Sequence, residues 1–276
     1  MVPTRRAIII SSPDEGGNFL PGTLLDPVNV TNYLCSPRGG SWYDEEIILL
    51  DDPDWRTALS IVYNTVADYL LIYFTGHGGT LDGKRVIKLK DGLIEDKQFI
   101  LGSSPRQLML VDACRNYLGA IGGIPEAEDE YSSFTGESVS RSLFDRYILN
   151  SHPGKMIVHA TKKGFSAQEV NGLGGVFTYY LLETAMKLQA DVDYTPVSVL
   201  ELLGYVKLKL GGEGFDQIPC LAYQEGWLSV PFMIAAPQIV ISGTDTYSQV
   251  PQLTEGQRLL AGIAIAAGIY HLLKSS

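Results

Sequence analysis

A succession of short apolar runs, separated by segments with helical spacing, most constrains how this chain can fold. The runs occupy residues 6–11, 46–50, 69–75, 107–113 and 155–161. They do not alternate apolar and polar residues, so both faces of each strand are expected to be buried. Strand and helix patterns alternate along the chain. This predicts an α/β fold with a mostly parallel sheet that helices cover on both faces.

The helical segments have recognisable ends. Helices are predicted over residues 26–34, 52–68, 175–189 and 195–210. Asp26 and Asp54 are good N-caps for the first two, and Pro196 suits the first turn of the last. Residues 84–92 predict one arm of a hairpin, and residues 218–223 predict a final strand.

Composition excludes some functions. The chain has 276 residues, 45% of them hydrophobic and 19% charged, as in ordinary globular proteins. Its formal net charge of −10 argues against a nucleic-acid partner, which would require a basic surface. The three cysteines, Cys35, Cys114 and Cys220, are odd in number and far apart, which fits neither a disulfide framework nor the spacing of a metal site. We therefore expect a reducing compartment and a cytoplasmic protein.

The chain is predicted to form one domain over residues 1–235 and a tail over 236–276. Within the domain, residues 119–151 are rich in Gly, Ser and Glu and show little periodicity over most of their length. A long segment of this kind predicts a flexible connection between a first part, 1–118, and a second part, 152–235.

The tail contains an apolar run from Leu259 to Leu273, which Arg258 and Lys274 flank. As a helix it would have no polar face, and it would rise about 22 Å, short of the roughly 30 Å hydrocarbon core of a bilayer. Two interpretations stay open: a helix buried against protein, such as another subunit, or a membrane-associated tail.

Two chemically active residues follow neighbouring apolar strands. His77 follows the 69–75 strand in the sequence TGHGG, and Cys114 follows the 107–113 strand in DACRN. The carboxyl ends of parallel strands meet at one edge of a sheet, so we expect the two side chains to lie together. An imidazole beside a thiol can form a nucleophile–base pair.

The alternative for each residue is a structural role. Buried cysteines are common, and a single histidine at a strand end is usually satisfied by its surroundings. The paired placement favours chemistry for these two, whereas Cys35, Cys220, His152, His159 and His271 are expected to be structural. The stretch GGTLDGKR nearly matches a phosphate-binding loop, but Arg85 replaces the hydroxyl residue and a strand pattern follows, so nucleotide binding is not expected.

These motifs together resemble the caspase–metacaspase class of cysteine peptidases, whose fold is a three-layer sandwich. TGHGG and DACRN occur in the family's order, each after a strand. Further matches are GTLLDPVNVTNYL, ATKKGFSAQEV with GGVFTYYLLETA, and QIPCLAY. The compact arrangement is similar to that of prokaryotic members.

The resemblance implies roles for individual residues. Cys114 would be the nucleophile and His77 the general acid/base. The amides of Gly78 and Cys114 would form the oxyanion hole. The family requires no third member of the triad, and the sequence offers no strong candidate.

Departures from the caspase pattern indicate which substrate residue the site would bind. Caspases have QAC before their glycine and a histidine about 50 residues upstream, whereas here the sequence is DAC and the spacing is shorter. Leu20 stands where caspases carry an arginine that binds substrate aspartate. Asp26 and Asp112 match acidic positions of metacaspases and would form a pocket for Arg or Lys.

No cofactor is expected, with one alternative. Some metacaspases bind calcium through acidic residues after the histidine, and Asp91, Glu95 and Asp96 lie in that region. Charges in such a position are usually solvated loop residues.

The predicted function is thus a caspase-like cysteine endopeptidase that cleaves after Arg or Lys. Related enzymes are often regulated effectors of cell death or defence, and many are processed in the connecting segment, where Arg141 and Arg146 are candidates. The sequence does not identify an activating ligand or partner. The alternative is a non-catalytic module of the same fold that senses a ligand or acts as a scaffold, docking through its C-terminal helix.

Overall fold

The computed structural model describes residues 2–15, 17–118, 137–170, 172–191, 193–226 and 229–237, which belong to one compact unit. The apolar run from Leu259 to Leu273, and with it the predicted membrane or oligomer contact, lies outside the described residues. No helix in the described part is long and apolar enough to cross a membrane.

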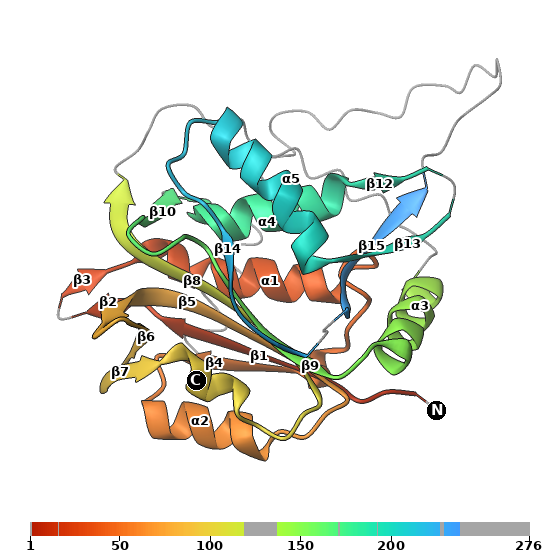
Figure 1. Cartoon of the computed structure of the whole chain (residues 1–276), viewed down its shortest axis with the longest axis horizontal. Helices are drawn as coiled ribbons and strands as arrows, with labels where there is room; N and C mark the ends of the chain where they lie inside the picture. The colour runs from red at the N-terminus through yellow and green to blue at the C-terminus, as the bar shows by residue number, and fades with distance from the viewer. Residues whose placement is uncertain are drawn as a thin grey trace, which may run out of the picture. The chain divides into compact units, whose positions relative to one another are not determined.

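A mostly parallel sheet forms the centre of this unit (Figure 1). Its path runs β11-β10-β8-β5-β1-β4, and β9 and β14 extend it beside β8. The pairs that β1, β4, β5, β8, β9 and β10 form with one another are parallel, whereas β14 is antiparallel to β9 and β11 to β10. The strands are β1 (Arg5–Ser12), β4 (Ile47–Asp51), β5 (Tyr69–Leu81), β8 (Arg106–Leu118), β9 (Gly154–His159), β10 (Ala167–Val170), β11 (Gly174–Gly175) and β14 (Cys220–Gly226).

Smaller strands and short 3-10 helices complete the framework. β6 and β7 form a hairpin on the end of β5, β12 and β13 both pair with β15, and β2 pairs with β3. The strands are β2 (Asp14–Glu15), β3 (Asn18–Phe19), β6 (Lys84–Leu89), β7 (Gly92–Glu95), β12 (Gln189–Ala190), β13 (Thr195–Ser198) and β15 (Pro231–Pro237). The 3-10 helices are η1 (Pro21–Leu24), η2 (Asp44–Glu46) and η3 (Asp96–Ile100).

Helices cover both faces of the sheet, as the uniformly apolar strands predict. The α-helices in the described residues are α1 (Asp26–Cys35), α2 (Trp55–Asn64), α3 (Glu137–Asn150), α4 (Val176–Lys187) and α5 (Val199–Gly212). One core combines alternate strand residues such as Ile9 and Tyr73 with side chains of α1, α3, α4 and α5. The other combines residues such as Ile8 and Phe74 with α2 and η3. Figure 1 shows α4 and α5 on one side of the sheet and α2 on the other.

The predicted elements are present, and besides several added short strands three differences stand out. Asp54 caps α2 by accepting from the Thr57 amide at 2.9 Å, as expected. The predicted helix over 195–210 begins only at Val199, because Ser198 and Glu201 form a capping box there. Residues Thr195–Ser198 pair instead with β15, a strand that sequence patterns did not indicate.

The third difference concerns the expected flexible connection over 119–151. Its first part, 119–136, lies outside the described residues, but its second part forms α3. The helix packs into the core through Phe144 and Ile148. The prediction is therefore wrong for this part, because apolar side chains one helical turn apart give α3 a face that packs into the core.

Four buried or partly buried charges attach α3 to the sheet, and we call them the paired cluster: Arg5, Glu46, Arg141 and Asp145. Arg5 Nη2 lies 3.4 Å from Glu46 Oε2, and Arg141 Nη2 lies 2.8 Å from Glu46 Oε1. Asp145 contacts Arg5 Nε at 3.4 Å. The Arg141 side chain is only 15% exposed. Each charge in the paired cluster thus has a partner of opposite sign.

Candidate active site

The backbone brings His77 and Cys114 together. Strands β5 and β8 pair in parallel from Leu70 opposite Gln107 to His77 opposite Cys114. Both strands continue beyond the predicted ends, so these residues form the last pair of the ladder rather than lying past it. The side chain of Cys114 is outside the described residues; its backbone position is directly across from His77.

The His77 ring is buried and oriented by a backbone carbonyl. Its Nε2 atom lies 2.7 Å from the carbonyl oxygen of Asn18 in β3. A carbonyl oxygen only accepts hydrogen bonds, so Nε2 carries the proton and Nδ1 remains the basic nitrogen. Sequence analysis found no third member for the pair. The group that orients the histidine is a main-chain atom, which leaves no signal in the side-chain sequence.

Glycines flank His77 because neighbouring chains approach it closely. Gly76 has φ +153°, and a Cβ there would collide with the carbonyl of Ser12 in β1. A Cβ on Gly78 would lie 2.7 Å from the Cβ of Ala113 and 3.0 Å from the Val86 carbonyl oxygen. The chain does not turn sharply here, because β5 continues into its hairpin with β6.

Asp26 faces the interior instead of capping its helix. The N-cap of α1 is Leu25, and no side chain caps that end. Asp26 Oδ2 accepts from Thr75 Oγ1 at 2.7 Å, and Oδ1 accepts from the Gly175 amide at 3.0 Å. The capping prediction is therefore wrong. Thr75 lies two residues before His77 on β5, so Asp26 is tied to the strand that carries the histidine.

The side chain of Asp112, on β8, hydrogen-bonds to the start of α4. Its Oδ2 accepts from the amide and the hydroxyl of Thr178, at 3.1 and 2.7 Å. Asp112 Oδ1 is buried and has no hydrogen-bond partner among the described residues. The α4 N-terminus thus favours negative charge at both aspartates, through the Gly175 amide at Asp26 and the Thr178 amide at Asp112.

Burial makes full ionisation of these aspartates unfavourable. Burial and the neighbouring Asp112 raise the pKa of Asp26 to about 8, although bonds from Thr75 and Gly175 oppose the shift. Burial raises the pKa of Asp112 to about 6, against the hydrogen bonds from Thr178. Two carboxylates that interact this closely share a proton near neutral pH. A cation bound beside both carboxylates would lower their pKa values and release the shared proton.

A third carboxylate, Glu169 on β10, belongs to the same group, and we call Asp26, Asp112 and Glu169 the acidic cluster. Glu169 is 1% exposed, and burial raises its pKa, with Asp112 adding to the shift and the Gly22 amide opposing it. Sequence analysis missed this residue. The available signal was a glutamate inside the short run AQEV, where an acid is unusual.

Other predicted residues lie elsewhere. Leu20, in the place of the caspase arginine, is buried. The calcium candidates have separate partners: Asp91 accepts from the Trp55 amide, Glu95 pairs with Lys84, and Asp96 pairs with His159. Among the described residues, no group of three such side chains has an arrangement that could hold a metal ion.

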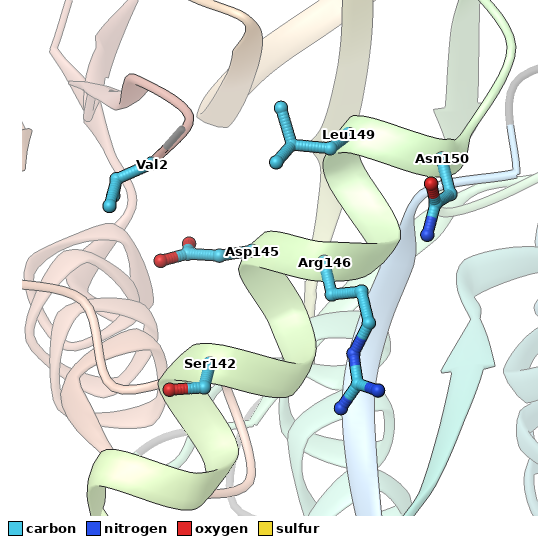
Figure 2. Close-up of a pocket in the computed structure, with 6 residues that line it drawn as sticks. All are labelled: Val2, Ser142, Asp145, Arg146, Leu149 and Asn150. Atoms are coloured by element: carbon cyan, nitrogen blue, oxygen red, sulfur yellow. The ribbon is translucent and has the colours of Figure 1, made fainter.

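The remaining thiols and a surface hollow add no chemistry to this edge of the sheet. Cys35 and Cys220 are half-buried and lie on other elements than the His77 edge. A hollow of about 290 Å³ lies against α3 and does not include His77 or the acidic cluster (Figure 2). Its lining residues are Val2, Ser142, Asp145, Arg146, Leu149 and Asn150.

Comparison with known proteins agrees with this geometry. The family model for the caspase domain matches residues 4–225. The chain therefore belongs to the caspase-domain family. A solved structure of caspase-1 from Spodoptera frugiperda is 15% identical, with a TM-score of 0.51, and the match covers 84% of this chain and 90% of that one. No curated protein matches.

Membership in the caspase-domain family confirms the predicted resemblance and the α/β sandwich. Caspase-family proteins are cysteine peptidases that act on protein substrates, so the coarse functional class of this caspase domain is a cysteine peptidase. At 15% identity the insect caspase shows the fold alone. Substrate preference must be argued from the residues of this chain.

Proposed function

We propose that the protein is a cysteine endopeptidase that uses Cys114 and His77 to cleave after a basic residue. The observation that carries the proposal is the register of β5 and β8, which sets position 114 directly opposite His77. Nearby, Asp26 and Asp112 provide buried negative charge for a cationic side chain.

The proposed reaction follows from the orientation of His77. Nδ1, the nitrogen that Asn18 leaves free of a proton, takes the proton from the Cys114 thiol. The thiolate attacks the scissile carbonyl, and the amides of Gly78 and Cys114 would stabilise the oxyanion. His77 then donates the proton to the leaving amine, and water hydrolyses the thioester. The Asn18 carbonyl stabilises the imidazolium that forms between these steps, because Nε2–H continues to donate to it.

The acidic side chains support a preference for Arg or Lys before the scissile bond. Leu20 offers no cation for a substrate aspartate, whereas Asp26 and Asp112 offer negative charge. A guanidinium or ammonium group near them would form charge-assisted hydrogen bonds and relieve their mutual repulsion.

Fluorogenic peptides with Arg, Lys, Asp or Leu at the cleavage position test the proposal. The wild type should hydrolyse the basic peptides, and Cys114→Ala and His77→Ala should each abolish turnover. Cys35→Ala and Cys220→Ala are matched controls that remove a thiol elsewhere and should retain activity. Retained cleavage in Cys114→Ala would remove the peptidase assignment from this site. An inactive but folded wild type would favour the non-catalytic module.

The cellular compartment and the biological role of the protein are also proposals. Three cysteines, odd in number and far apart in the sequence, favour a reducing compartment such as the cytoplasm. A regulated role in cell death or defence follows from the resemblance to prokaryotic members of the family. Comparing growth of cells that express wild type with cells that express Cys114→Ala would test that role.

A further inference from the structure

The edge of β8 that faces away from β5 has two successive partners. β9 pairs with β8 in parallel as far as His159 opposite Val111. The chain then leaves the sheet, and β10 takes over with Ala167 opposite Cys114. On the other edge, β5 accompanies β8 only as far as His77 opposite Cys114. Position 114 is therefore the last residue of β8 that pairs with β5 and the first that pairs with β10.

The ladder between β8 and β10 has a bulge directly after position 114. Ala167 lies opposite Cys114, but the next residue of β10, Gln168, lies opposite Asn116. Arg115 is thus the extra residue of β8 at this bulge. Bulges are frequent beside active sites, where they change the direction in which a side chain points. The backbone that carries the proposed nucleophile therefore depends on how β10 is held.

One side chain joins β9 and β10 where they separate along β8. Gln217 lies in the segment between α5 and β14 and is 2% exposed. Its Nε2 atom donates to the carbonyl oxygen of Ala160, the residue that follows β9, at 3.1 Å. Its Oε1 atom accepts from the amide of Gln168 on β10 at 3.0 Å. A primary amide has a donor and an acceptor side by side, so it can replace a peptide group between two strands that form no ladder with each other among the described residues.

We propose that Gln217 is a positioning residue for Cys114, a proposal that rests on the proposed function. The amide that Gln217 holds belongs to Gln168, the β10 residue at the bulge beside position 114. The carbonyl of Ala160 fixes the other end of this bridge to the end of β9. Without the bridge, β10 and the bulge are free to shift relative to β9, and position 114 shifts with them relative to His77. A thiolate depends on a nearby imidazolium, so this shift lowers the fraction of reactive thiolate at a given pH.

A second buried glutamine provides a matched control. Gln107 lies near the opposite end of β8 and is fully buried. Its Nε2 atom donates to the carbonyl oxygens of Gly102 and Ser104, at 2.9 Å each. Substitution by Met removes the amide and its bonds to the backbone in both cases, with little change in side-chain length. Only Gln217 holds a strand that pairs with position 114.

The test measures alkylation of Cys114 by iodoacetamide as a function of pH, followed at that residue by mass spectrometry. In the wild type the midpoint of this profile should lie well below the roughly 8.5 of a free thiol. Gln217→Met should move the midpoint toward that value by at least about one pH unit. The kcat for a basic peptide should fall about 100-fold with a smaller change in KM, because misplaced reacting groups impair the chemical step. Gln107→Met should lower stability in urea but keep the wild-type alkylation profile and kcat.

Gln217→Asn is the second variant, because it disturbs the fold less. It is one methylene shorter, so it can reach one of the two backbone groups but not both. Its alkylation profile should shift in the same direction by a smaller amount. Wild-type profiles in the folded Gln217 variants, or an equal shift in Gln107→Met, would overturn the inference and leave the peptidase in place. A wild type whose Cys114 reacts with the profile of a free thiol would instead remove the proposed function.

Discussion

The protein buries two groups of charges, and they are built in opposite ways. The paired cluster alternates two arginines with two acids, whereas the acidic cluster gathers three carboxylates with no cation among the described residues. Both groups are largely withdrawn from water. The two clusters therefore differ in whether they combine charges of opposite sign.

The pKa directions show what this difference means. Burial alone would raise the pKa of Glu46, but the hydrogen bond from Arg141, the Tyr43 amide and the Arg5 charge lower it overall. For Asp26 and Asp112 burial prevails, and the pKa of each is raised. The paired cluster is complete within the fold and holds α3 in place. The acidic cluster has no cationic partner among the described residues, and under the proposed function the substrate's basic side chain would supply one.

The largest effect on stability is expected from breaking the paired cluster. Glu46→Ala leaves Arg141 and the buried Arg5 without their shared partner, which typically destabilises a protein by about 3–5 kcal/mol. Urea unfolding should show this loss, while peptide hydrolysis per folded molecule stays close to wild type. Glu45→Ala, at an exposed neighbouring position, is the control and should change stability by less than about 0.5 kcal/mol. Equally small losses of stability in Glu46→Ala and Glu45→Ala would mean that the paired cluster does not hold α3 in place.

Removing charge from the acidic cluster should lower peptide hydrolysis and leave the stability of the fold almost unchanged. Asp112→Asn retains an oxygen for Thr178 but loses half of the proposed aspartate pair. Loss of one partner of a buried charge pair typically corresponds to about 2–5 kcal/mol, so kcat/KM for Arg peptides should fall at least about 30-fold. Cys114 alkylation and urea unfolding should change little. Better hydrolysis of Asp peptides than of Arg peptides by the wild type would contradict the acidic pocket.

The sequence predicted the sheet, the main helices and the backbone placement of positions 77 and 114 on neighbouring parallel strands. Each rests on local patterns: uniformly apolar strands, helical spacing, and the rule that parallel strands end at one edge. The missed features depend on contacts between distant segments. Strand β15 forms only because β12 and β13 pair with it. The carbonyl that orients His77 comes from Asn18, on a hairpin far earlier in the chain.

Asp26 shows why the site was only partly predictable. At the first position of a helix an aspartate usually interacts with that helix's own amides, and the local pattern predicted this. Here Thr75 and the Gly175 amide bind it instead, from β5 and from the start of α4. Glu169 was missed for a related reason, because its place in the acidic cluster depends on two carboxylates that other segments supply.

A smaller effect should appear in the pH dependence of stability. The folded pKa of Asp26 is about 8, above its ordinary value of 3.8, so over this range the folded state binds more protons than the unfolded state. The stabilisation is therefore full below about pH 4 and is lost as the pH rises through 8. Asp26→Asn removes this dependence. Relative to wild type, its unfolding free energy should gain about 2.7 kcal/mol between pH 5 and pH 7, measured by urea unfolding. A wild type and variant with parallel pH profiles would show that Asp26 is ionised throughout.

The smallest expected effect concerns self-cleavage, which depends on the preference of the acidic cluster and on the contacts of the paired cluster. A peptidase that requires a basic residue cannot cleave itself between residues 116 and 140, because that stretch contains no Lys or Arg. The next arginine, Arg141, lies within α3 and is held by Glu46. Arg146 is exposed but also helical, and a peptidase needs an extended segment.

Mass spectrometry of active wild type should therefore find an intact chain, contrary to the processing expected from related enzymes. Glu46→Ala should release Arg141 and produce a new terminus after it, absent when Cys114→Ala is added. New termini in the wild type that Cys114→Ala removes would show that the paired cluster does not protect α3.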